Sequence, residues 1–257
     1  MLSSGRKCES NQPQVSIGRQ ISRPAAPINL MLRALIFDFD GLILDTETPL
    51  LRSWQEVIAQ HGARMDPATL IRLIADTREP EDAYRLLEAR LGGLINRSEV
   101  RRARLAREAE LIAEEKAMPG LESLLKTARG AGLMTAIASS SSLSWIAPHL
   151  ARLGLASSFQ CICSRDDVDR VKPDPELYFA VLADLGIGSG EAVALEDSPT
   201  GAESARRAGV VCVAVPNPAT ADLVWGDVDL RVPSLAAVTL DLLASLVSPH
   251  QDGGRRP

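Results

Sequence analysis

The chain has 257 residues, of which 46% are hydrophobic and 24% are charged. This composition excludes a mainly disordered, collagenous or fibrous protein and is enough for one large domain or two modest ones with a buried core. Charged residues or prolines interrupt every apolar run before membrane-spanning length, so we expect no membrane partner. The formal net charge of −5 provides no electrostatic basis for binding nucleic acid.

The two ends of the chain differ from the rest. Residues 1–30 are rich in Ser, Gln and Pro, show no apolar period and lack the apolar stretch of a secretory signal. We interpret them as a disordered tail that is dispensable for activity, with a transit peptide or a biological start at Met31 as alternatives. Residues 248–257 are interpreted as a second tail.

Between these tails, short apolar runs alternate with helical patterns. Leu32–Phe37 predicts a first buried parallel strand, and residues 46–117 then read as several helices without an obvious strand. Further strands are predicted at Leu133–Ala138, Gln160–Cys163, Ala192–Leu195 and Val210–Val215. This alternation predicts an α/β fold, a doubly wound parallel sheet or Rossmann-like core, with an inserted all-helical cap domain. The expected core is residues 31–45 and 118–247, and the expected cap is residues 46–117.

The cysteines are Cys8, Cys161, Cys163 and Cys212, and none forms a CxxC pair. With the three histidines far apart in the sequence, this spacing fits no zinc site. Cys161 and Cys163 are predicted to share one face of a strand as buried free thiols. Reduced thiols favour a cytoplasmic location.

Polar residues follow the first two strands where each strand ends. The motif DFDG occupies residues 38–41, and residues two apart in an extended chain point the same way, so Asp38 and Asp40 are expected to converge. Two neighbouring carboxylates repel each other unless a cation is present. Ser139 and Ser140 follow the second strand, where a hydroxyl and backbone N–H groups can cradle an anion. Taken alone, these patterns equally fit an acidic loop and a plain helix N-cap.

Two further motifs follow later in the chain. Lys172, one of four lysines, precedes a Pro-Asp-Pro turn, and a compact ammonium suits a phosphate or a carboxylate cluster. Glu196 and Asp197 follow the fourth strand and precede a helix with Ser198 as its cap and Pro199 at its first position. Adjacent acids at the mouth of a sheet suit a hard cation, although the helix dipole is a structural explanation for them.

In order, spacing and position at strand ends, these four motifs resemble the haloacid dehalogenase superfamily, in particular its phosphatase and beta-phosphoglucomutase-like branch. The resemblance covers about residues 32–245, and the helical block matches the small cap of that branch. It implies a Mg²⁺-dependent phosphatase that acts on a small phosphorylated metabolite, a sugar phosphate, through an aspartyl phosphate. We expect this metabolite as the partner and a monomer or weak dimer as the assembly.

The resemblance also implies a role for each motif. Asp38 attacks phosphorus, and Asp40 acts as general acid and then as general base. Mg²⁺ is held by the Asp38 side chain, the Asp40 carbonyl and the acids at 196–197. The carboxylates contribute −4 while Mg²⁺ and Lys172 return +3, so binding a phosphate dianion requires a proton on one carboxyl, which Asp40 is expected to hold.

The remaining implied roles concern phosphate and substrate. Ser139 and the N–H of Ser140 are expected to bind the phosphoryl oxygens, and Lys172 to offset charge between them and the nucleophile. Thr46 is expected at the hinge into the cap, and Arg78 is expected to contact substrate, because its segment resembles a substrate-binding segment of the beta-phosphoglucomutase cap. The tryptophans Trp54, Trp145 and Trp225 are expected to be packing or surface residues rather than ligands.

Four other functions are weighed. A dehalogenase needs no metal, which the acids at 196–197 disfavour. Phosphonate hydrolysis in this superfamily uses a cap lysine, and here Lys116 stands at the cap edge alone. A non-catalytic phosphometabolite-binding module would be expected to lose the nucleophile or a metal acid, and this chain keeps them. A beta-phosphoglucomutase-type mutase shares every catalytic residue, but Ser142 and Leu143 replace its sugar-holding Lys-Asn pair, so hydrolysis is favoured.

Overall fold

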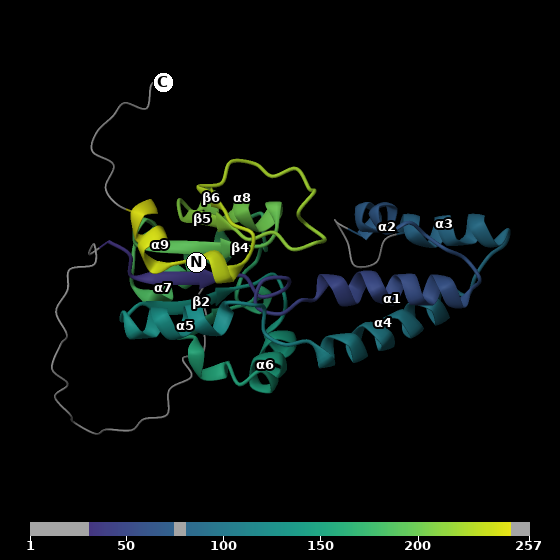
Figure 1. Ribbon diagram of the computed structural model, residues 1–257, viewed down its shortest axis with the longest axis horizontal. Coiled ribbons are helices and arrows are strands. Elements are labelled where there is room, and N and C mark those ends of the chain that lie inside the picture. Colours follow the sequence, from purple (N-terminus) through teal and green to yellow (C-terminus); the bar gives the residue numbers. More distant parts are fainter. Residues whose placement is uncertain (1–30, 75–80, 248–257) are drawn as a thin grey trace, which may run out of the picture.

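The computed structural model describes residues 31–74 and 81–247, with one parallel sheet at its centre (Figure 1). The sheet has six strands in the order β3-β2-β1-β4-β5-β6. Their bounds are Ala34–Phe37 for β1, Met134–Ala138 for β2, Cys161–Cys163 for β3, Ala192–Glu196 for β4, Val211–Ala214 for β5 and Leu230–Arg231 for β6. The chain therefore starts at the centre and winds outward in both directions, which confirms the predicted doubly wound α/β fold.

Helices cover both faces of the sheet because β1 is apolar on both sides. Leu35 and Phe37 pack on one face, whereas Ala34 and Ile36 pack on the other. The first face is covered by α5 (Leu121–Gly130), α6 (Leu143–Arg152) and α9 (Leu240–Leu246), and the second by α7 (Glu176–Leu185) and α8 (Pro199–Arg207). Continuous apolar runs of this kind are typical of parallel strands buried on both faces.

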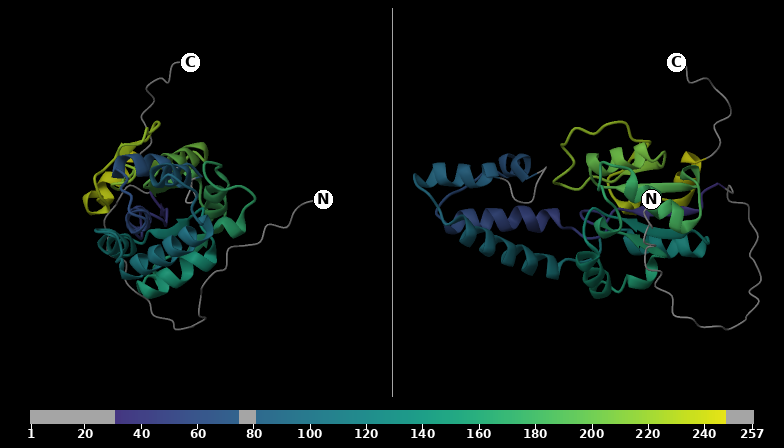
Figure 2. Two further views of the ribbon diagram at one scale, coloured as in Figure 1. Left: turned by 90° about the vertical axis from the view of Figure 1, so that its right-hand side faces the viewer. Right: turned by 180° about the vertical axis from the view of Figure 1, so that it is seen from behind.

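Four helices form a second lobe between β1 and α5 (Figures 1 and 2). They are α1 (Glu47–Gln60), α2 (Pro67–Ile74), α3 (Glu81–Leu91) and α4 (Arg97–Glu114). This lobe, the cap, has its own apolar cluster, in which Trp54 of α1 packs with Leu70 of α2 and Tyr84 of α3. The described part of residues 46–117 contains no strand beyond an isolated bridge at Ala117, in line with the sequence pattern.

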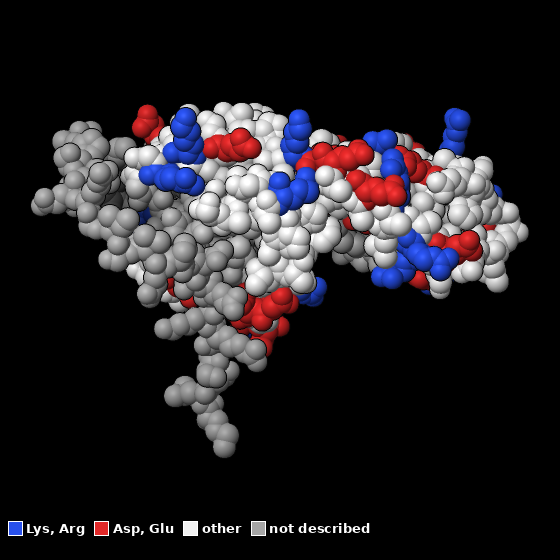
Figure 3. Space-filling view, turned by 90° about the horizontal axis from the view of Figure 1, so that it is seen from below, with Lys and Arg blue, Asp and Glu red and all other residues white. Residues whose placement is uncertain are grey.

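The sequence predicted five strands to within one or two residues at each end, but it missed β6. Two residues are too few for a hydrophobic period, and the segment 216–229 before β6 has none either. Cys161, Cys163 and Cys212 are buried free thiols, as predicted. Among the described residues, no helix is long and apolar enough to cross a membrane. Acidic and basic side chains lie interspersed over the cap face seen in Figure 3.

Candidate active site

The central strands bring the sequence motifs to one edge of the sheet. β1 lies between β2 and β4, with Phe37 paired to both Ile137 and Leu195, so the residues that follow these strands emerge side by side. The backbone N–H of Asp38 donates to the Leu195 carbonyl at 3.0 Å. Asp38 is therefore flanked by the serine run after β2, residues 139–142, on one side and by the acids at the end of β4 on the other.

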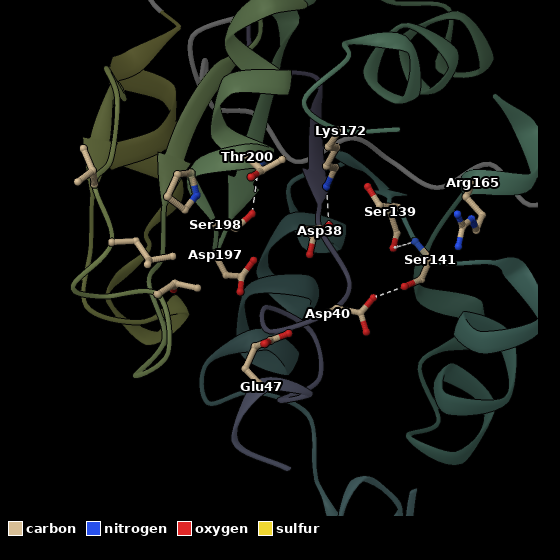
Figure 4. A pocket seen from close by; sticks show the side chains of 16 residues that line it. Asp38, Asp40, Glu47, Ser139, Ser141, Arg165, Lys172, Asp197, Ser198 and Thr200 are labelled. Carbon is tan, nitrogen blue, oxygen red and sulfur yellow. Dashed lines mark hydrogen bonds and ion pairs between the residues drawn. The ribbon is translucent and has the colours of Figure 1, made fainter. Parts of the chain in front are cut away.

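Lys172 bridges two of these carboxylates, and Figure 4 shows its contact with Asp38. Its Nζ donates to Asp38 Oδ1 at 2.5 Å and to Glu196 Oε1 at 2.6 Å, and its side chain is 5% exposed. The Tyr178 hydroxyl of α7 also donates to Glu196 Oε1. Burial opposes the charge of Lys172, but the two carboxylates together outweigh burial and hold the pKa of the ammonium above its usual value.

Asp38, Glu196 and Asp197 form a buried carboxylate cluster. Each offers an oxygen that lies within 4.8 Å of the others. Burial, together with the neighbouring carboxylates, raises the pKa of Asp38 to about 7 and raises that of Asp197 well above its usual range. Glu196 Oε2 is buried and has no hydrogen-bond partner. A set of hard oxygen donors with excess negative charge and one unsatisfied oxygen fits a divalent cation such as Mg²⁺.

The carboxylate of Asp40 lies outside this cluster. Ser141 Oγ donates to its Oδ2 at 2.5 Å, and the indole Nε1 of Trp145 donates to its Oδ1 at 2.9 Å. Asp38 and Asp40 line the same pocket, as their spacing predicted, but they have different partners. Trp145 packs against the apolar cluster of the core, as expected, and its indole N–H in addition binds a candidate catalytic acid.

The serine run after β2 forms a turn that lies beside Asp38. Ser139 Oγ accepts the N–H of Ser141 at 3.1 Å, which leaves its own hydroxyl hydrogen to be donated elsewhere. Ser139 and Ser140 both line the pocket. Ser142 occupies the N-cap position of α6, but its side chain makes no capping bond and pairs instead with Ser144 Oγ at 2.9 Å. A plain helix cap therefore does not explain the run.

The backbone at position 41 passes so close to the Asp197 carboxylate that only glycine fits there. The φ of Gly41 is +79°, and a Cβ at this position would lie 2.1 Å from Asp197 Oδ2. The same Asp197 oxygen accepts the side-chain N–H of Asn217 at 2.8 Å. The side-chain amide oxygen of Asn217 in turn accepts the backbone N–H groups of Ala219 and Thr220. Asn217 therefore joins the carboxylate cluster to the rest of the segment 216–229.

A pocket of about 600 Å³, here called the catalytic pocket, is lined by Asp38, Asp40, Lys172 and Asp197 (Figure 4). Its wall also includes Glu47 from α1, Arg165 after β3 and Val224 from the segment 216–229. A second pocket, of about 370 Å³, shares Ser141 and Arg165 with the first. The rest of the second pocket is formed by α4, Ser142 and Trp145.

The predicted site residues fall into three groups. The structure brings together around the catalytic pocket Asp38, Asp40, Ser139, Ser140, Lys172, Glu196 and Asp197. Thr46 is fully buried at the N-terminus of α1, where the chain enters the cap. Arg78 lies outside the described residues.

Sequence reasoning missed Trp145, Arg165, Tyr178 and Asn217. Arg165 stands two residues beyond β3, so the rule that located the other motifs at strand ends would have found it. Asn217, which comes three residues after β5, carries a weaker form of the same signal. Trp145 and Tyr178 are helix residues, and nothing in their local pattern indicates which acid each one meets.

Comparisons with known proteins show the family of this chain. The model of the haloacid dehalogenase-like hydrolase family matches residues 35–215. The chain is 41% identical over 213 residues to "Putative phosphatase YhcW" of Bacillus subtilis, covering 83% of this chain and 96% of that protein. It is 30% identical over 224 residues to hexitol phosphatase B of Escherichia coli, covering 82% and 96%. A crystal structure of CbbY from Rhodobacter sphaeroides in complex with phosphate matches with a TM-score of 0.59 and 28% identity, covering 80% and 96%.

Proposed function

The chain belongs to the haloacid dehalogenase-like hydrolases and is a phosphoric monoester hydrolase, and on this premise we propose that it hydrolyses a small sugar phosphate through an aspartyl phosphate on Asp38. The observation that carries the proposal is the buried contact of Lys172 with both Asp38 and Glu196 at the floor of the catalytic pocket. A carboxylate held by an ammonium beside two more acids is suited to phosphoryl transfer rather than to a structural role.

In the first half-reaction, an oxygen of Asp38 forms a bond to phosphorus while the bond from phosphorus to the sugar oxygen breaks. Asp40 gives its proton to the departing sugar oxygen. The hydroxyl of Ser139 and the N–H of Ser140 bind the phosphoryl oxygens, and Lys172 offsets their charge. The product of this step is the sugar alcohol group and a phosphorylated Asp38.

In the second half-reaction, water attacks the phosphorus of phosphorylated Asp38. Asp40, now ionised, takes a proton from that water as the bond from phosphorus to the Asp38 oxygen breaks. Inorganic phosphate leaves, Asp38 is regenerated as a carboxylate and Asp40 is protonated again. The two donors on Asp40, Ser141 and Trp145, are compatible with an acid that is held in place through both steps.

We propose Mg²⁺ as the metal, held by the side chains of Asp38, Glu196 and Asp197 and by the carbonyl of Asp40. The unpartnered Oε2 of Glu196 and the raised pKa values of Asp38 and Asp197 support this assignment, since all three reflect buried negative charge. When bound, the cation supplies positive charge to the phosphoryl oxygens in the transition state. Asn217 and Gly41 fix Asp197 for this purpose.

Two observations support a sugar as the non-phosphate part of the substrate. Hexitol phosphatase B and the fructose-1-phosphate phosphatase YqaB of Escherichia coli are relatives of this chain. The second pocket adjoins the catalytic pocket at Ser141 and is lined by Arg101, Glu108 and Arg165, which offer hydrogen bonds to hydroxyl groups. A polyol beyond the scissile bond would extend into this space.

Hydrolysis is favoured over phosphosugar transfer by the residues that come after Ser139 in the chain. At the positions of the mutase Lys-Asn pair, Ser142 pairs with Ser144, and the backbone N–H of Leu143 donates to Asp166 at 2.9 Å. Neither side chain offers a cation or an amide to retain a bisphosphate. Incubation with beta-glucose 1-phosphate and a trace of the 1,6-bisphosphate should yield free phosphate, and accumulation of glucose 6-phosphate would favour the mutase.

We further propose a cytoplasmic enzyme that is a monomer or weak dimer. The described cysteines are buried free thiols, which suits a reducing compartment. Three exposed large apolar side chains, Leu94, Phe179 and Val224, come from separate parts of the chain: the segment between α3 and α4, α7 and the segment 216–229. Sedimentation equilibrium should give the monomer mass at micromolar concentration, and a stable dimer would contradict the assembly.

The function is tested by phosphate release from a panel that contains fructose 1-phosphate, glucose 1-phosphate, glucose 6-phosphate, mannitol 1-phosphate and glycerol phosphate. We expect at least one sugar phosphate to be hydrolysed in the presence of Mg²⁺, and the rate to fall when EDTA is added. Absence of release from every ester would support the non-catalytic binding module instead.

A further inference from the structure

Both carboxylate oxygens of Asp40 are occupied by donors from one segment of the chain. Oδ2 accepts from Ser141 Oγ at 2.5 Å, and Oδ1 accepts from Trp145 Nε1 at 2.9 Å. The two donors differ in kind. A serine hydroxyl rotates and also accepts hydrogen bonds, whereas an indole N–H only donates and points in one direction from its ring. The direction of the Asp40 carboxylate is therefore set mainly by Trp145.

Trp145 is itself held in place. It lies in the first turn of α6, and its ring packs edge-on against His149, with 4.5 Å between the ring centroids. His149 is next to Phe39, the neighbour of Asp40 in the chain, at 6.4 Å. Burial and Arg152 lower the pKa of His149, although Asp40 opposes this, so its ring is neutral near pH 7. An uncharged ring thus supports the indole, and the indole supports the carboxylate.

Trp145 also stands at the border of the two pockets. Asp40 lines the catalytic pocket, while Trp145 lines the second pocket, into which the sugar would extend. The scissile oxygen joins the phosphoryl group in the first pocket to the sugar in the second. The hydrogen bond from Trp145 to Asp40 therefore lies at the boundary where the leaving oxygen needs its proton.

We propose that Trp145 is a positioning residue for proton transfer, and that its indole N–H aims the carboxyl group of Asp40 at the leaving oxygen. This inference rests on the proposed function, in which Asp40 carries the proton. Proton transfer needs heavy atoms within about 2.6–3.2 Å, and a displacement of about 1 Å costs on the order of 100-fold in rate. Without Trp145, the contact of Ser141 with Asp40 would remain, through an oxygen that can rotate away.

The test compares leaving groups. Nitrophenolate departs from p-nitrophenyl phosphate without a proton, whereas a sugar alkoxide needs one. kcat/KM reports the steps up to departure of the leaving group, so it separates proton donation from the later attack of water. The measured quantity is the ratio of kcat/KM for the best sugar phosphate of the panel to kcat/KM for p-nitrophenyl phosphate.

Trp145→Phe removes the N–H and keeps a ring against His149. We expect this variant to lower kcat/KM for the sugar phosphate about 10-fold and to change that for p-nitrophenyl phosphate less than about 2-fold. Trp225→Phe is the matched control, because it removes an indole N–H that donates to the Thr220 carbonyl at 3.0 Å, and its ratio should equal that of the wild type. Retained p-nitrophenyl phosphate activity also shows that the variant is folded.

Equal losses on both substrates would mean that Trp145 is merely structural, and no loss on either would mean that its hydrogen bond is idle. Both results overturn the inference. Asp40→Asn, measured on the same pair of substrates, separates this outcome from failure of the proposed function. If Asp40→Asn does not selectively impair the sugar phosphate, Asp40 is not the proton carrier and the proposed mechanism fails. If Asp40→Asn is selective but Trp145→Phe is not, the inference about Trp145 alone fails.

Discussion

The core and the cap of this molecule use charged residues in opposite ways. At the end of the central strands, Asp38, Lys172 and Glu196 are buried and in direct contact, with side chains 11%, 5% and 0% exposed. In the cap, pairs such as Arg97 with Glu81 are largely exposed, at 37% and 55%. Burial makes each of these charges in the core depend on its partners, whereas water screens exposed pairs such as this one in the cap.

The cap has one described pair that resembles the core. Arg104 and Glu108 lie one turn apart on α4 with side chains 0% and 7% exposed, and the Arg104 guanidinium stacks on Trp54. Both residues line the second pocket. Charge is therefore buried in the described cap where α4 lines the second pocket, whereas charged side chains are exposed over the cap face seen in Figure 3. In the proposed function, the core supplies the chemistry and this face of the cap contacts the variable part of the substrate.

The largest effect is expected from Asp38→Asn. Without the proposed nucleophile the covalent route would be closed, and turnover should fall by at least about 10⁴-fold. The fold should persist, because the change removes a buried charge rather than a contact of the apolar core. Glu81→Gln makes the same chemical change on the cap surface and should leave turnover and stability as in the wild type. Substantial phosphate release by the Asp38 variant would refute the role of this residue.

Lys172→Met is expected to have the next largest effect. It leaves two buried carboxylates without their ammonium, so the free energy of unfolding should fall by about 3–5 kcal/mol. Arg85→Met is the matched change in the cap, where both partners, Glu81 and Asp82, are exposed, and it should leave the urea midpoint nearly unchanged. Similar midpoints for the two variants would contradict the contrast between core and cap.

The sequence predicts a site residue when its place follows from the residues next to it, and fails when its place depends on how distant elements pack. Asp38, Ser139 and Glu196 were predicted because each directly follows a continuous apolar strand, and parallel strands end at one edge. Tyr178 and Trp145 were not predicted, because each lies on a helix and contacts its acid, Glu196 or Asp40, from there. Their contacts depend on how α7 and α6 pack against the sheet, which no local pattern encodes.

A smaller effect separates the two adjacent acids. Glu196 Oε1 is already engaged by Lys172 and Tyr178, whereas Asp197 has only Asn217 and its neighbours in the cluster as described partners. Because Glu196 is shared with Lys172 and Tyr178, Glu196→Gln should weaken Mg²⁺ binding about 10-fold, and Asp197→Asn should weaken it more. Calorimetric titration with Mg²⁺ gives both dissociation constants, and equal values would refute the ranking.

The smallest effect is a dependence of stability on pH. Burial raises the pKa of Asp38 to about 7, above the value near 3.9 in an unfolded chain, so its contribution to stability falls as pH rises between these values. In EDTA, the thermal midpoint should therefore be lower at pH 8 than at pH 5. Mg²⁺ should reduce this difference, and Asp38→Asn should reduce it without metal. A thermal midpoint in EDTA that rises from pH 5 to pH 8 would contradict the raised pKa of Asp38 and the excess of negative charge in the cluster.

The most direct test of the central claim is to trap the covalent intermediate. The enzyme is mixed with its best sugar phosphate, labelled in the phosphoryl group, and quenched in acid within milliseconds before peptides are sequenced. The mechanism predicts label on the peptide that contains Asp38, at no more than one phosphoryl group per chain, and none in the Asp38→Asn variant. Rapid turnover with no label on Asp38, or with label on another residue, would contradict it.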